Sequence, residues 1–206
     1  MDKNKLFQAG SWLWLGLNLL AIGIFTLFGP AEKSLGVYVR VVYLHGVWVW
    51  TALAGFLGAG AAGLIALIWR RQAFYDWSRA LGYTGLLFWL TYLPLSLWAM
   101  QTNWNGLFLA EPRWRLALAF AISGLVLQLG LVLVNRPALT ALANVAFAGF
   151  LFGTLGAVEN VMHPSSPIFD SDARAIQVFF LGLLLLTLLA GAQIAYHFYR
   201  RSIIRV

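Results

Sequence analysis

Two histidines carry the main chemistry that this sequence offers. His45 stands inside the apolar stretch 40–50, which reads RVVYLHGVWVW, and His163 follows another apolar stretch within ENVMHP. An ionisable side chain in a membrane segment costs about 2.5 to 3.5 kcal/mol on insertion scales, so it usually faces a cavity, a partner or a ligand. Imidazole is a common haem ligand, and a neutral ring needs no charge compensation. Both residues are therefore candidate axial ligands of iron, whereas the alternative for His45 is a core histidine bonded to a neighbouring helix.

The absence of cysteine restricts metal or haem chemistry to histidine. None of the 206 residues is a cysteine, which excludes disulfides, thiolate metal ligands and the Cys-x-x-Cys-His sequence for covalent haem attachment. No Ser-His-Asp set, paired-carboxylate site, phosphate-binding loop or HExxH zinc pattern is apparent. We therefore expect a binding or carrier protein rather than an enzyme.

The composition is that of a membrane protein. Hydrophobic residues make up 61% of the chain and charged residues 10%, whereas about 25% of the residues are charged in an ordinary water-soluble domain. The net charge of +7 does not indicate a nucleic-acid partner, because the basic residues gather at the ends of apolar stretches. The partner that this pattern predicts is a lipid bilayer.

Apolar stretches long enough to cross that bilayer define the expected fold. Each of the stretches that lack Asp, Glu, Lys and Arg has about 20 residues or more, which spans roughly 30 Å as a helix. The six stretches are Leu6 to Ala31, Val41 to Trp69, Ala80 to Ala110, Leu116 to Asn135, Pro137 to Val158, and Ala175 to Tyr199. The sequence therefore predicts an all-α, polytopic fold with six transmembrane helices, forming one domain over residues 1–206.

The positions of the basic residues predict the orientation. With a cytoplasmic amino terminus, the inside segments carry nine lysines and arginines and the outside segments carry five. The inside residues are Lys3, Lys5, Arg70, Arg71, Arg79, Arg136, Arg200, Arg201 and Arg205, and the outside residues are Lys33, Arg40, Arg113, Arg115 and Arg174. We therefore expect both termini in the cytoplasm, a location in the cell (inner) membrane, and external loops at 29–40, 101–115 and 163–174.

This orientation places both candidate ligands near the external face. His45 follows Arg40 by five residues, so it lies roughly 7.5 Å below it in a helix, and His163 opens the third external loop. Arg40 could bind a haem propionate in bidentate fashion, or it could be a snorkelling interfacial residue. Glu159 precedes His163 by one helical turn and could orient its imidazole, or it could pair with an arginine of an external loop.

Small residues recur in the second and fifth stretches, at 54–63 and 149–156. Glycine and alanine allow helices to approach closely in a membrane, and the alternative is room for a flat ligand against the backbone. Pro94 is expected to kink the third helix and Pro137 to begin the fifth.

Residues 28–50 (FGPAEKSLGVYVRVVYLHGVWVW) resemble the start of the second span in the haem-handling proteins of cytochrome c maturation, the CcmC and CcsA group. The residues that match are Gly36, Arg40, Tyr43, His45 and Trp50. The segment 104–113 (WNGLFLAEPR) is similar to the tryptophan-rich WWD motif of that family. Trp104 matches the leading tryptophan, Glu111 replaces the aspartate, and Arg113 matches the arginine. His163 falls where the family has its second haem-ligating histidine.

The segment also departs from the motif. Leu107, Phe108 and Ala110 stand where the family has tryptophans, so the aromatic surface that would stack on a porphyrin is reduced. The resemblance implies non-covalent binding of b-type haem at the external face and presentation of that haem for cytochrome c biogenesis. The residues implied in haem binding are His45, His163, Arg40, Trp104, Phe108, Glu111 and Arg113, with the two histidines as iron ligands.

The implied partners are a haem chaperone or other membrane proteins of cytochrome c maturation. Two other functions stay open from the sequence. One is an electron-transfer subunit that holds haem permanently between the same histidines. The other is a structural subunit of a larger membrane complex that kept the fold but lost haem transfer.

Overall fold

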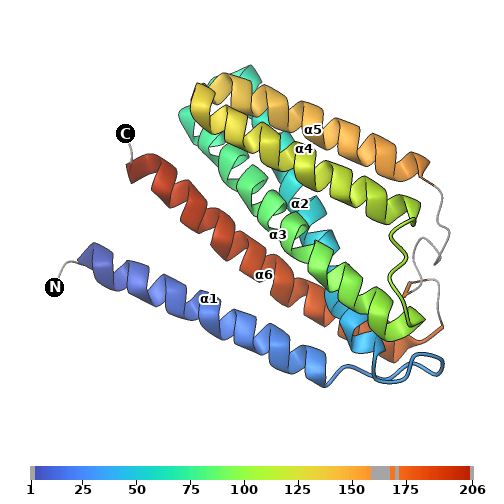
Figure 1. Ribbon diagram of the computed structural model, residues 1–206. Coiled ribbons are helices and arrows are strands. Elements are labelled where there is room, and N and C mark those ends of the chain that lie inside the picture. Colours follow the sequence, from blue (N-terminus) through green and yellow to red (C-terminus); the bar gives the residue numbers. More distant parts are fainter. Residues whose placement is uncertain (1–2, 159–167, 170–171, 205–206) are drawn as a thin grey trace.

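The protein is a bundle of long helices (Figure 1), seen in a computed structural model that describes residues 3–158, 168–169 and 172–204. The helices are α1 (Lys3–Leu27), α2 (Val39–Trp69), α3 (Gln72–Trp104), α4 (Pro112–Val134), α5 (Pro137–Ala157) and α6 (Arg174–Ile204). The described ranges contain no strand, only an isolated bridge between Glu32 and Gly36. The predicted all-α class is therefore confirmed for this part of the chain.

Five of the helices, α2 to α6, are long and apolar enough to cross a membrane. The shortest, α5, has 21 residues, which at a rise of about 1.5 Å per residue spans roughly 30 Å. In α1 the apolar part whose side chains are described is shorter, Ser11–Leu27. The chain is therefore a multi-pass membrane protein.

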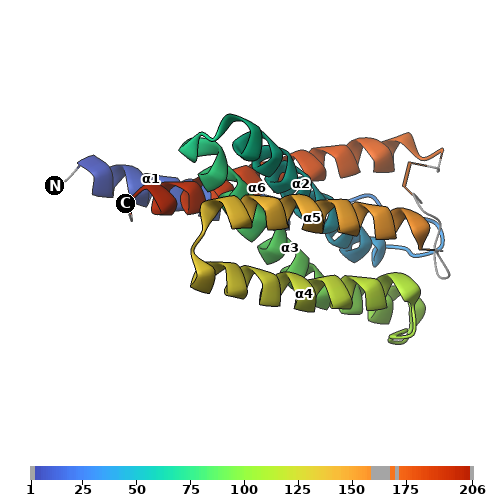
Figure 2. The same ribbon diagram turned by 90° about the horizontal axis from the view of Figure 1, so that it is seen from above.

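Helices α2 and α3 form the centre of the bundle. They pack against each other along their length, with α4 and α5 on one side and α6 on the other (Figures 1 and 2). Helix α1 is outermost and packs mainly on α6. The largest fully buried side chains include Tyr43 of α2, Phe88 and Trp89 of α3, and Phe180 of α6. The core therefore joins these three helices at the level of the candidate site.

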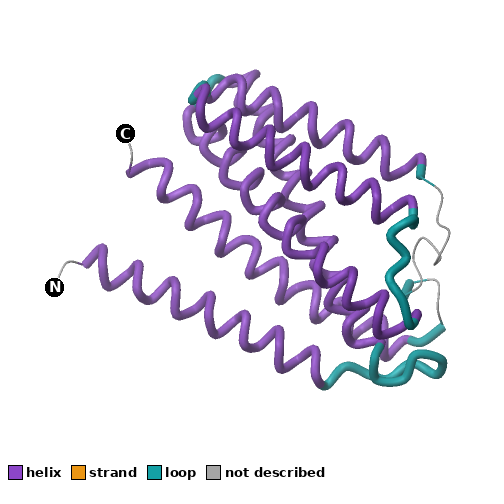
Figure 3. Tube along the Cα trace, in the orientation of Figure 1, coloured by secondary structure: helices purple, strands orange, loops and turns teal. Residues whose placement is uncertain are grey.

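The two ends of the bundle differ in their connections. Two-residue turns at 70–71 and 135–136 lie at the same end as both chain termini (Figure 3). The longer loops 28–38 and 105–111 lie at the opposite end, where Asn103 Nδ2 donates to the Tyr38 carbonyl at 3.4 Å. All candidate site residues that the structure describes are at this loop end.

Glycine allows α2 and α3 to come into backbone contact. A Cβ atom on Gly55 would lie 2.8 Å from both Cα and N of Gly85. The expected close packing is therefore confirmed in α2. The same prediction of close packing is wrong for the glycines of α5. No described atom lies within 4 Å of a Cβ placed on Gly149, Gly153 or Gly156.

A buried polar network joins four helices nearer the turn end. Asn144 Nδ2 of α5 donates to the carbonyl of Ser78 at 3.0 Å and to its hydroxyl at 3.1 Å. Asn144 Oδ1 accepts from Gln128 Nε2 of α4 at 2.9 Å, and the Ser78 hydroxyl donates to the Ala59 carbonyl of α2 at 2.8 Å. Such bonds hold helices together where hydrocarbon offers no other polar partner.

Candidate functional site

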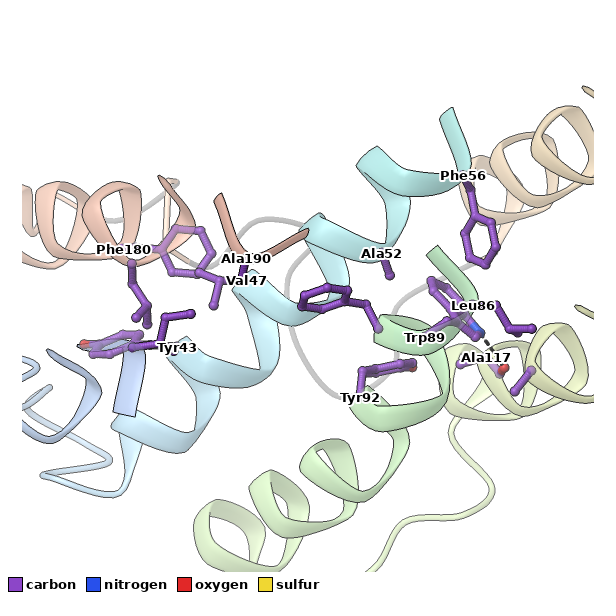
Figure 4. Packing of buried hydrophobic residues seen from close by; sticks show 14 of the residues in the cluster. Tyr43, Val47, Ala52, Phe56, Leu86, Trp89, Tyr92, Ala117, Phe180 and Ala190 are labelled. Atoms are coloured by element: carbon purple, nitrogen blue, oxygen red, sulfur yellow. Dashed lines mark hydrogen bonds between the residues drawn. The ribbon is translucent and has the colours of Figure 1, made fainter. Parts of the chain in front are cut away.

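His45 lies in the second turn of α2 and faces α3. Its ring centroid is 5.2 Å from that of Tyr92, with the ring planes at 45°. Tyr92 in turn lies 5.2 Å from Trp89, whose indole Nε1 donates to the Ala117 carbonyl of α4 at 2.9 Å (Figure 4). The half-buried imidazole therefore packs against a row of tilted aromatic rings inside the bundle.

The loop that leads into α2 is anchored by the helix itself. Arg40 Nε donates to the Gly29 carbonyl at 2.9 Å, and the Tyr43 hydroxyl donates to the Pro30 carbonyl at 3.1 Å. Two residues that the family resemblance singled out thus have a structural role in fixing the loop. The Arg40 bond uses only Nε of the guanidinium. Binding of a haem propionate by Arg40 stays a prediction.

Glu32 organises the middle of the same loop. Its carboxylate accepts bonds from the Ser34 hydroxyl and from the backbone N–H groups of Ser34 at 2.8 Å and Leu35 at 2.9 Å. These bonds, that of the Ser34 side chain first, lower the pKa of the Glu32 carboxyl below its usual value. Gly36 closes the turn at a φ of 58°, which favours glycine. The loop therefore has a defined shape where it meets α2.

The loop 105–111 leads into α4, whose first turn lies at about the same depth in the bundle as His45. Ala117 is fixed beside Trp89 by the indole bond. Arg113 is one turn, about 6 Å, outward from Ala117, and Tyr92 is about 4.5 Å outward from Trp89. The structure therefore places Arg113 at about the depth of Tyr92, which contacts His45, although these residues are widely separated in the sequence.

Several polar atoms beside this arrangement are buried without a hydrogen bond to the described residues. Glu111 is only 7% exposed, and its Oε2 lacks such a bond although the residue caps α4. The same holds for Arg113 Nε, Trp114 Nε1 and Asn103 Oδ1. Leaving a buried polar group unpaired costs about 1 to 3 kcal/mol. Two of these four atoms are donors, and a guanidinium or indole N–H can donate to a carboxylate such as a propionate.

The tip of the loop is an exposed apolar surface. The rings of Trp104 and Phe108 lie 6.1 Å apart and are nearly perpendicular, at 75°. Leu107, Phe108 and Leu109 are 53%, 38% and 47% exposed. Two rings set edge to face do not form a flat platform. The expectation that this loop offers a reduced stacking surface to a porphyrin stays a prediction.

The other histidines have separate locations. His163 and Glu159 lie outside the described residues, so the approach of His163 to His45 stays a prediction. His197 is at the turn end of α6, where it stacks on Trp12 with ring centroids 3.9 Å apart. Of the described histidines, only His45 lies at the loop end.

Sequence reasoning did not single out Tyr92 or Asn103. The available signal was weak, because a tyrosine or an asparagine near the end of an apolar span is common for interfacial reasons. Trp114 Nε1 is also buried. Only the fold shows that these residues flank His45 or the returning loop.

Comparison with protein-family models, curated proteins and solved structures gives no match for the chain. Within the described residues there is also no group of three or more His, Cys, Asp or Glu side chains that could hold a metal ion. An assignment of function thus depends on the arrangement around His45.

Proposed function

We propose that this protein binds b-type haem non-covalently at the loop end of the bundle and presents it for cytochrome c biogenesis. In this proposal α1 also crosses the membrane, so that the protein has six spans. Both termini are cytoplasmic, and the loop end faces outward from the cell (inner) membrane. The observation that carries the proposal is the interior-facing imidazole of His45 beside Tyr92, with Arg113 at about the same depth because Trp89 is bonded to the Ala117 carbonyl.

The side chains around His45 are of the types that could hold a haem. His45 and His163 would hold the iron of a bound haem through their imidazoles. Tyr92 holds the His45 ring from the α3 side. Arg113, with its buried and unbonded Nε, is the proposed donor to a propionate, and Arg40 is the second candidate.

The loop tip supports presentation rather than permanent storage. Trp104 and Phe108 offer less stacking area than a row of tryptophans, and each fully buried aromatic contributes on the order of 150 to 250 Å². Weak stacking would leave the haem exchangeable. The exposed side chains of 107–109 are then the proposed contact surface for a haem chaperone or another maturation protein.

The experiment is haem reconstitution of the purified protein and of three histidine variants. We expect a Soret band for the wild type, its loss in His45→Ala and His163→Ala, and its retention in His197→Ala, whose imidazole lies at the opposite end. Yield of c-type cytochrome in cells should fall in the first two variants only.

Three outcomes would contradict the proposal. No haem binding by the wild type would favour a structural subunit. Tight, redox-active haem with an unchanged cytochrome yield in the ligand variants would favour an electron-transfer subunit. Equal loss of haem in His197→Ala would show that the variants act through folding and not through coordination.

A further inference from the structure

The turn end of the bundle carries a concentration of arginines that the proposed function does not use. The described arginines there are Arg70, Arg71, Arg79, Arg136, Arg200 and Arg201. The acidic side chain described at this end is Asp76, which is buried and accepts a bond from Gln72 at 3.1 Å. No exposed carboxylate among the described residues therefore neutralises this end.

The arginines are held on a rigid frame. In the turn between α2 and α3, the backbone of Arg70 has the left-handed conformation, with a φ of 53°, and its N–H donates to the Ala66 carbonyl. Arg71 follows with an extended backbone. The turn between α4 and α5 repeats this geometry, with Asn135 at φ 48° and Arg136 extended. Figure 1 shows the two turns at the same end of the bundle. Arg71 and Arg136 thus occupy equivalent positions in the two turns.

A surface hollow of about 360 Å³ is lined by Trp69 and Arg71. The Trp69 indole is 61% exposed and rests edge-on against Phe74, with ring centroids 5.6 Å apart. Nearby in α2, Ile68 and Leu64 are 66% and 52% exposed, as expected of lipid-facing side chains. The hollow therefore opens where the apolar surface ends and the arginines begin.

We propose that this hollow binds the headgroup of an anionic phospholipid. Arg71 would bind the phosphate through its planar guanidinium, which matches phosphate oxygens geometrically. Trp69 would pack on the glycerol region, because an indole is amphipathic and prefers the membrane interface. Leu64 and Ile68 would contact the acyl chain. A free anion would contact only Arg71. A phospholipid would contact Arg71 through its phosphate and the apolar side chains through its glycerol region and acyl chain.

Electrostatics gives the expected size of the effect. Each Lys or Arg near a membrane surface contributes about 1 kcal/mol to attraction of anionic lipid, which corresponds to a roughly fivefold change in affinity. Arg71→Gln should therefore bind an anionic lipid about fivefold more weakly, and Arg71→Lys should recover part of the loss. The contrast should shrink at high salt.

The test uses the full chain in an uncharged detergent. Native mass spectrometry would measure retention of phosphatidylglycerol and of uncharged-headgroup phosphatidylcholine by wild type, Arg71→Gln, Arg71→Lys and the control Lys33→Gln. Lys33 is exposed and lies at the loop end, so its substitution removes an equal charge far from the hollow. Thermal unfolding of each variant checks that the fold is kept.

Preferential retention of phosphatidylglycerol by the wild type, with weakening in Arg71→Gln, partial recovery in Arg71→Lys and no weakening in Lys33→Gln, would support the site. Equal retention of both lipids would overturn it. So would equal weakening in Arg71→Gln and Lys33→Gln, which would indicate attraction by net charge alone. Displacement of the lipid by inorganic phosphate at low millimolar concentration would show a simple anion site instead.

Discussion

Replacing Gly55 by alanine would test the backbone contact between α2 and α3 that positions His45 against Tyr92. The new Cβ would lie 2.8 Å from Cα and N of Gly85, whereas carbon atoms in contact prefer about 3.5 to 4.0 Å. Both opposing atoms belong to the backbone and cannot rotate away. The helices must therefore separate by roughly 0.7 Å or more to restore contact distance.

The energetic cost follows from this separation. Overpacking in a close-packed interior costs about 1 to 3 kcal/mol. Alanine is also a better helix former than glycine by roughly 0.8 to 1.0 kcal/mol, which would partly conceal the effect. Gly149→Ala in α5 is the matched control, because it gains the same propensity and meets no described atom within 4 Å. We expect Gly55→Ala to be less stable than Gly149→Ala by about 1 to 3 kcal/mol.

Reversible unfolding in mixed micelles, followed by circular dichroism, measures this difference. Haem reconstitution of both variants adds a functional readout, and we expect a weaker Soret band in Gly55→Ala only. Equal unfolding free energies for the two variants would refute the reasoning, because they would show that α2 and α3 are not in backbone contact at Gly55.

The remaining predictions concern the loop before α2 and the buried polar network. The pKa of Glu32 is lowered in the folded loop, so its stabilising contribution is fully present above the ordinary pKa of a glutamate and is lost as the pH falls below it and through the lower pKa of the folded loop. Hydrogen exchange of the Ser34 amide, corrected for its intrinsic rate, should accelerate over that range in the wild type and show no such dependence in Glu32→Gln. Tyr43→Phe removes the bond to the Pro30 carbonyl and should lower the unfolding free energy by about 0.5 to 1.5 kcal/mol in the same micelle titration; an unchanged value would exclude a role in anchoring the loop. Asn144→Ala removes three interhelical bonds of about 0.6 kcal/mol each, so a loss near 2 kcal/mol is expected, and no loss would argue against the network.

The sequence alone determined the helical class and most of the helix positions. The expected stretches Leu116 to Asn135 and Pro137 to Val158 correspond to α4 and α5, with the amino end of α4 extended to Pro112. An apolar run sets the length of a membrane helix, and proline at its first position marks the start. The third helix differs from the expected stretch. It runs from Gln72 to Trp104, whereas the stretch without charged residues runs from Ala80 to Ala110. Charged residues before Ala80 are tolerated in the helix because Asp76 is bonded to Gln72, one turn earlier.

The sequence also identified His45 and Arg113 as residues of interest, but the tertiary structure decided how they are related. Tyr92 of α3 contacts His45, and the bond between Trp89 and the Ala117 carbonyl places Arg113 at about the same depth. In an apolar helix every face is hydrophobic, so the spacing of residues along it does not reveal which side meets a neighbour. That choice depends on close contacts such as Gly55 against Gly85, which form only when two helices distant in sequence are packed together.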